Sequence, residues 1–122
     1  MADHDEILDR FFAAIEAGDL DTVADCYADD VVVWNNLARS DATKADNLRL
    51  LGWWHGRVDG LRYEIVERIP CDGGVVQRHV IHGSFEGEAL EVPCCIVFRI
   101  AGGRISALHE YLDKLSLGGV LG

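Results

Sequence analysis

The sequence has little positive charge and no long apolar run. Its 122 residues contain 11 lysines and arginines against 21 aspartates and glutamates, which gives a formal net charge of −10. Nucleic-acid backbones and anionic membrane surfaces are bound by clustered basic side chains. The longest apolar stretches, such as residues 94–98, are far shorter than the roughly 20 residues that span a bilayer. We therefore expect no nucleic-acid partner and no membrane partner.

The sequence also lacks the features of a secreted or metal-binding chain. Its N-terminus, MADHDE, is acidic where a secretory signal peptide is basic, which predicts a cytoplasmic location. Cysteines occur at positions 26, 71, 94 and 95 without a C-x-x-C pair. Adjacent residues of a strand point to opposite faces, so Cys94 and Cys95 cannot share a tetrahedral metal ion. We expect reduced thiols, no metal and no bound cofactor.

Length and composition are those of one globular domain. Hydrophobic residues make up 49% of the chain and charged residues 26%, which is ordinary for a folded protein. A chain of this length can bury a core and still hold a small internal pocket. No repeat, linker or low-complexity segment interrupts it. Residues 1–122 are therefore predicted to form a single domain.

The first half of the chain predicts helices. Apolar residues recur at helical spacing up to Ile15, and Gly18 ends this segment. Asp19 is expected to cap a second, short helix that runs to about residue 27, and residues 40–41 to cap a third that runs to residue 53 or 54. Between the second and third helices, the β-branched and aromatic residues 31–36 predict a short strand.

From residue 61 onward the chain predicts long strands separated by glycine turns. Strands are expected over residues 61–71, 75–85, 89–100 and 104–113, with turns at DGG, EGE and AGG between them. Helices followed by an antiparallel meander predict an α+β fold. In this fold three N-terminal helices pack on one face of a strongly curved, mainly antiparallel sheet. The cone between helices and sheet is expected to hold an internal pocket.

Two segments carry a resemblance to a known family. The order of elements, together with DDVVVWNN at residues 29–36 and GGRISALHEYLD at residues 102–113, resembles the SnoaL-like branch of the nuclear-transport-factor-2-like superfamily, which has a cystatin-like fold. The resemblance covers essentially the whole chain and implies one SnoaL-like domain. The superfamily includes isomerases, dehydratases, cyclases, epoxide hydrolases and proteins without catalysis, so the fold implies a pocket rather than one reaction.

Within that superfamily, the site layout is partly similar to that of limonene-epoxide hydrolase. That family has an aromatic-x-Asn group on its first strand, an Arg-x-Asp pair on a middle strand, and an acid on the last strand before a tyrosine. The resemblance places Trp34 and Asn36 in the first group, Arg78 and Val80 in the second, and Glu110 at the third position. Tryptophan stands here for the family's tyrosine, and valine, which cannot transfer a proton, for its acid.

Strand alternation extends this interpretation to neighbouring residues. If Arg78 faces the pocket, so do Val80 and His82, while His79 faces away. A one-residue bulge would exchange the two histidines, so both stay candidates. The apolar residues predicted to line the pocket are Trp34, Trp54, Val80, Val92, Cys94, Ile96, Leu108 and Leu112.

The predicted chemistry centres on Glu110. Its apolar neighbours would raise the pKa of its carboxyl group and make it an effective general base or acid near neutral pH. Arg78 would hold Glu110 ionised or bind an oxyanion, and His82 or His79 would carry a proton. Asn36 would orient water or a substrate oxygen.

These residues support three hypotheses. The leading one is a cofactor-independent acid–base enzyme, of isomerase, dehydratase, cyclase or epoxide hydrolase type, that acts on a small hydrophobic molecule. The second is a binding domain that captures such a molecule without turnover, with Arg78 and Glu110 as a buried ion pair. The third is a dimerisation domain with a filled interior. In each case, apolar and aromatic residues such as Tyr111 on the outer sheet face predict a homodimer.

Overall fold

The computed structural model describes residues 2–121, which form three helices and a six-stranded sheet. The helices are α1 (Ala2–Ala17), α2 (Leu20–Cys26) and α3 (Lys44–Arg57). The strands are β1 (Tyr27–Asn35), β2 (Asp41–Ala42), β3 (Asp59–Cys71), β4 (Gly74–Phe85), β5 (Glu88–Ala101) and β6 (Arg104–Leu112), followed by a 3₁₀ turn, η1 (Leu115–Leu117). Within this part of the chain, no helix is long and apolar enough to cross a membrane.

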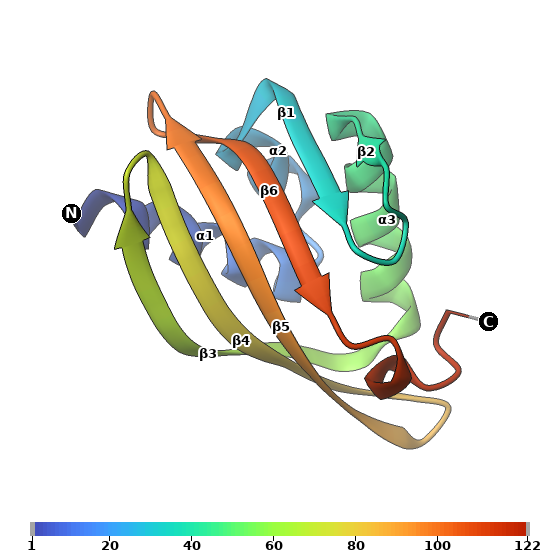
Figure 1. Ribbon diagram of the computed structural model, residues 1–122. Helices are drawn as coiled ribbons and strands as arrows, with labels where there is room; N and C mark the ends of the chain where they lie inside the picture. Colours follow the sequence, from blue (N-terminus) through green and yellow to red (C-terminus); the bar gives the residue numbers. More distant parts are fainter. Residues whose placement is uncertain (1, 122) are drawn as a thin grey trace.

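The sheet is mixed because its first and last strands, β1 and β6, are neighbours and run parallel. The strand order is β2-β1-β6-β5-β4-β3 (Figure 1). Strands β3 to β6 form the predicted antiparallel meander, whereas β1 runs parallel to β6. In this register Val33 lies opposite Leu108 and Asn35 opposite Glu110. The pairing therefore places the end of β1 beside the predicted catalytic carboxylate.

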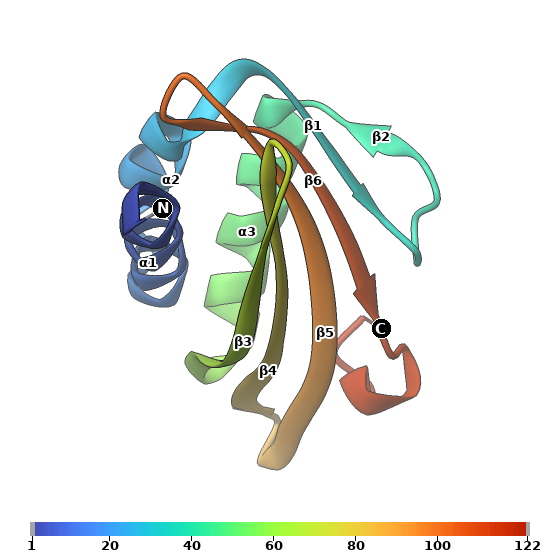
Figure 2. The same cartoon turned by 60° about the vertical axis from the view of Figure 1, so that its left-hand side comes forward.

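The helices cover the concave face of the sheet. Figure 2 shows the sheet bending around α1 and α3. The apolar stripe of α1 is buried as its spacing predicts, and the ring of Phe11 lies 6.0 Å from that of Phe98 on β5, centroid to centroid. The α+β fold with helices on a curved sheet is confirmed.

The helix caps follow local sequence, with one correction. Asp19 caps α2 as predicted, since its carboxylate accepts from the backbone N–H of Thr22 at 3.1 Å. Residues 40–41 do not cap α3. Thr43 does, because its hydroxyl accepts from the backbone N–H of Asp46 at 3.2 Å. The residues before it form the edge strand β2, and α3 continues beyond the predicted end to Arg57.

Strand β4 faces the opposite way from the prediction. Gln77 and His79 point inward and are buried, while Arg78, Val80 and His82 point outward. The two rows of this strand are equally apolar, so hydrophobicity alone does not select between them. Charge does, because the outward row lies opposite two glutamates on β3.

Strand β1 is shifted in the same way. Val33 and Asn35 point inward, and Trp34 points outward, where its ring centroid lies 5.2 Å from that of Tyr111. The predicted faces of β5 and β6 are confirmed, since Cys94 and Ile96 point inward and Glu110 lines the interior. The outer face exposes apolar side chains, Val32, Val66 and Tyr111 among them, and the homodimer through this face stays a prediction.

Candidate active site

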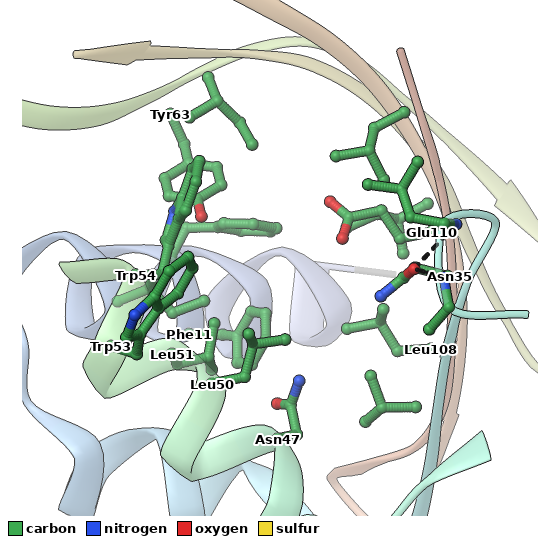
Figure 3. Close-up of a pocket in the computed structure, with 18 of the residues that line it drawn as sticks. Phe11, Asn35, Asn47, Leu50, Leu51, Trp53, Trp54, Tyr63, Leu108 and Glu110 are labelled. Atoms are coloured by element: carbon green, nitrogen blue, oxygen red, sulfur yellow. Dashed lines mark hydrogen bonds between the residues drawn. The ribbon is translucent and has the colours of Figure 1, made fainter. Parts of the chain in front are cut away.

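A cavity of about 280 Å³ lies between the concave face of the sheet and α3. Its walls come from α1, α3, all long strands of the sheet and the C-terminal turn, and are mainly aliphatic and aromatic. At roughly 30 Å³ per non-hydrogen atom of a liquid such as water, this space holds on the order of ten such atoms. The cavity therefore suits a small, mostly apolar molecule. Side chains that define it include Phe11, Leu50, Leu51, Trp54 and Leu108 (Figure 3), together with Ile96.

Glu110 is the acidic group of this cavity. Strand β6 carries it between Leu108 and Leu112, and Figure 3 shows its carboxylate pointing into the cavity toward the side chains of α3. Burial in these surroundings raises the pKa of the Glu110 carboxyl from 4.5 to about 7, although hydrogen bonding with the Cys94 thiol acts in the opposite direction. Near neutral pH, Glu110 is therefore present in both its ionised and its protonated form.

Two asparagine side chains present N–H groups to the same space. The Oδ1 atom of Asn35 accepts from the backbone N–H groups of Leu37 at 2.9 Å and Ala38 at 2.8 Å. The Oδ1 atom of Asn47, on α3, accepts from the Tyr27 hydroxyl at 2.6 Å. Because both oxygens are occupied, both NH₂ groups are left to the cavity, as Figure 3 shows. They can donate hydrogen bonds to an oxygen of a bound molecule.

The Tyr63 hydroxyl adds a further donor to the cavity, on the side of Trp54 (Figure 3). Burial and the Glu110 carboxylate raise the pKa of Tyr63 well above its usual range, and a hydrogen bond with Trp54 opposes them. Tyr27 has its pKa raised by the same two causes. Both hydroxyls therefore keep their protons and act as hydrogen-bond donors.

Beside Glu110, away from the open part of the cavity, lie His79 and Cys94. A ring nitrogen of His79, the Sγ atom of Cys94 and a carboxylate oxygen of Glu110 all lie within 4.8 Å of one another. Burial and the charge of Arg68 lower the pKa of His79 to about 4, and burial raises that of the Cys94 thiol. At neutral pH the cluster therefore consists of a neutral imidazole, a thiol and a titrating carboxyl.

Several of the predicted site residues meet in this place. Trp54, Ile96, Leu108, Leu112 and Glu110 all line the cavity. The question left open between the two histidines is resolved by position, because His79 is the inward one.

Cys94 is buried on the same face as Glu110. Val92 is also buried on that face but lies outside the cavity wall.

Other predicted residues lie elsewhere. On the outer face, Arg78 pairs with Glu67 at 2.8 Å. The Nε2 atom of His82 lies 2.7 Å from a carboxylate oxygen of Glu64 on the same face. Neither can reach Glu110, because the sheet separates them from it.

The same holds for Val80 and Trp34, which lie on the outer face. Asn36 uses its whole amide to bind the backbone of Leu112, with Nδ2 donating to the carbonyl at 3.1 Å and Oδ1 accepting from the N–H at 2.9 Å. These two bonds give Asn36 a structural role at the ends of β1 and β6.

The structure brings other polar residues to the interior, which the predicted pattern did not include. Shifting the predicted pattern by one residue gives Val33-x-Asn35 on β1 and Gln77-x-His79 on β4, which are the inward pairs. The sequence of β3 contained an indication of the correct face of β4. Its glutamates lie opposite the basic residues of β4, and this charge pairing indicates that the basic row is the exposed one.

Solved structures of NTF2-like proteins share this fold over nearly the whole chain. An LEH-like epoxide hydrolase of Mycobacterium tuberculosis superposes with a TM-score of 0.79 at 23% sequence identity, covering 98% of this chain and 90% of that one. IdmH of Streptomyces antibioticus, described as a candidate polyketide cyclase, gives a TM-score of 0.82 at 18% identity, with 97% of both chains covered. The class of fold is thus an NTF2-like α+β domain.

Within this class, the family is also defined. The model of the SnoaL-like domain matches residues 8–108, and the chain belongs to this family. The uncharacterized protein Rv0034 of Mycobacterium tuberculosis (strain ATCC 25618 / H37Rv) is 30% identical over 112 residues, which are 87% of this chain and 86% of that protein.

Proposed function

We propose that the protein is a cofactor-independent acid–base enzyme in which Glu110 removes a proton from a carbon atom of a small, mostly apolar molecule. The observation that supports this proposal most is the burial of one carboxyl group in an apolar cavity, with its pKa raised to about 7. A general base is most effective when its pKa lies near the working pH. A desolvated carboxylate also accepts a proton more readily than one in water.

The polar groups around Glu110 fit this role. When a proton leaves a carbon next to a carbonyl group, negative charge develops on the carbonyl oxygen. Such an oxygen can be stabilised by hydrogen bonds from the NH₂ groups of Asn35 and Asn47 and from the hydroxyl of Tyr63. These donors stay neutral, since none of them transfers its proton. In an isomerase, Glu110 then returns the proton to another carbon. In a cyclase, the carbanion instead forms a bond to a second carbonyl carbon, and Glu110 returns the proton to the oxygen of that carbonyl. The proposed reaction is thus of the isomerase or cyclase type.

Epoxide hydrolysis fits the same residues less well. Opening an epoxide with water requires two groups, a base for the water and an acid for the departing oxygen, and Glu110 can act as only one of them at a time. His79 is neutral at neutral pH because its pKa is lowered to about 4, and the pKa of Tyr63 is raised. Neither is a strong acid. The remaining alternative is a binding protein that holds a small hydrophobic molecule in the same cavity without turnover.

A test that needs no knowledge of the natural substrate uses 5-nitrobenzisoxazole. A base removes the proton on its ring carbon, the N–O bond breaks, and a coloured cyanophenolate forms. We expect kcat/KM to rise with pH and to level off above a midpoint of about 7, because Glu110 must be ionised. Arg78→Gln, on the outer face, is expected to leave this profile unchanged. A rate no higher than that of free acetate at equal pH would argue for the binding protein.

A further inference from the structure

A line of polar side chains leads from α1 to the neighbourhood of Glu110. Arg68 on β3, whose side chain is 14% exposed, has its Nη1 atom 2.8 Å from a carboxylate oxygen of Asp9. Its Nε atom donates to Oε1 of Gln77 at 2.9 Å. Gln77 is fully buried, and its Nε2 atom lies 2.8 Å from Nδ1 of His79. Two side chains, one on β3 and one on β4, thus connect the surface of α1 to the ring of His79.

Arg68 determines which way the Gln77 amide points. A guanidinium group has N–H donors and no acceptor, so Gln77 must turn its oxygen toward Arg68. Its NH₂ group then faces His79. Because an NH₂ group only donates, Nδ1 of His79 must accept with its lone pair and carries no proton.

The proton of His79 is therefore on its other ring nitrogen. A neutral imidazole has one N–H, and with Nδ1 occupied as an acceptor this is Nε2–H. The Nε2 atom is buried and has no hydrogen-bond partner among residues 2–121. One ring nitrogen of His79 lies within 4.8 Å of both Glu110 and Cys94. Since Nδ1 is engaged with Gln77, we assign this nitrogen as Nε2.

We propose that Arg68 and Gln77 are positioning residues that hold His79 in its Nε2–H form. This N–H group then acts as a hydrogen-bond donor to the Glu110 carboxylate, on the side away from the open part of the cavity. The inference rests on the proposed function of Glu110 as the base. An N–H donor at this place favours the ionised carboxylate and restrains its rotation, either directly after a small side-chain movement or through one bridging water. His79 keeps its proton throughout, so Glu110 alone exchanges a proton with the substrate.

The same chain of hydrogen bonds opposes a metal ion at this place. Imidazole, thiolate and carboxylate are zinc ligands, and here all three types lie within 4.8 Å. To bind zinc through Nε2, His79 would have to move its proton to Nδ1. Gln77 would then have to turn its oxygen to His79 and its NH₂ group to Arg68, where two donors would meet. We therefore expect that zinc chloride does not raise the melting temperature of the protein.

Gln77→Glu is the variant that tests the tautomer. Glutamate has nearly the same shape, pairs with Arg68, and accepts from His79 instead of donating to it. In ¹⁵N spectra of the ligand-free proteins, we expect Nδ1 of His79 to be unprotonated in the native chain and protonated in Gln77→Glu. Arg78→Gln on the neighbouring outer face is the matched control and should leave the His79 signals unchanged. A protonated Nδ1 in the native chain, or a melting temperature raised by zinc, would overturn the assignment.

The pH profile of 5-nitrobenzisoxazole ring opening tests the consequence for Glu110. In Gln77→Glu the Nε2 lone pair replaces the N–H beside the carboxylate, so the midpoint is expected to rise by about one pH unit. The rate at neutral pH then falls about fivefold and recovers at higher pH. A midpoint that stays or falls, with thermal unfolding showing a folded variant, would contradict the positioning role. The ¹⁵N result needs no turnover, so it can hold even if the protein proves not to catalyse.

Discussion

Replacing Glu110 with glutamine is expected to lower kcat/KM for 5-nitrobenzisoxazole by about 10²–10⁴-fold, which is the usual contribution of a positioned general base. Glutamine has almost the same volume and keeps a polar group in the cavity, but it cannot accept the proton. The donors from Asn35 and Asn47 stay in place, since neither is bonded to Glu110. The rate should be measured at about pH 8, where most of the native carboxyl is ionised.

Binding provides the control for this experiment. Trp53 and Trp54 line the cavity, so quenching of their fluorescence reports an occupied site. We expect the cyanophenolate product to bind to Glu110→Gln at least as tightly as to the native chain, because glutamine removes the negative charge that repels this anion. Equal rates for the two proteins would show that Glu110 is not the base. Equal binding with no turnover in either protein would favour the ligand-binding function.

The same substitution is expected to stabilise the protein at alkaline pH. The pKa of Glu110 is 4.5 in the unfolded chain and about 7 in the folded one, so the folded state holds this proton more tightly. Its contribution is fully favourable below pH 4.5 and is lost as the pH rises through 7. At about pH 8 the native protein keeps an ionised carboxylate in an apolar cavity, at a cost on the order of 3 kcal/mol that glutamine does not bear.

Urea unfolding of both proteins at about pH 4 and about pH 8 measures this cost as a change in their stability difference. The difference should grow by roughly 3 kcal/mol in favour of Glu110→Gln between the two values. Any fixed effect of the amide group cancels, because it does not depend on pH. Glu88→Gln, an exposed substitution at the start of β5, is the control and should show little change. A pH-independent difference for Glu110→Gln would mean that the Glu110 carboxyl is not desolvated.

Activity and stability are thus expected to conflict at one residue. A buried carboxylate is costly for the fold, and the same burial makes it a good base. The raised pKa of Glu110 and the lowered pKa of His79 have the same main cause, which is removal of both groups from water by the apolar side chains around them.

The sequence was sufficient to predict the fold and the position of Glu110 in the cavity, but not the other polar residues of the site. Apolar neighbours on both sides of Glu110 indicated the inner face of β6, and a stripe from Val92 to Ile96 indicated that of β5. The resemblance to limonene-epoxide hydrolase placed Trp34 and Arg78 in the site, although both lie on the outer face. The two rows of β1 and of β4 are equally apolar, so hydrophobicity did not correct this assignment.

The remaining residues depend on contacts between distant parts of the chain. Asn47 lies on α3 and is oriented by Tyr27, 20 residues earlier. Gln77 is oriented by Arg68 across two strands, and Arg68 by Asp9 on α1. A local pattern of hydrophobicity does not predict contacts between such distant residues. The hydrogen-bond donors of the cavity could therefore be identified only from the folded structure.

The most direct test of the account is the titration of Glu110 itself. With ¹³C-labelled glutamate, the side-chain carboxyl signal of Glu110 can be assigned by its absence from Glu110→Gln and followed as the pH is changed, without any ligand. The account predicts a midpoint of about 7. A midpoint near 4.5, the value of an exposed glutamate, would show that the carboxyl is solvated and would remove the basis for its role as the base.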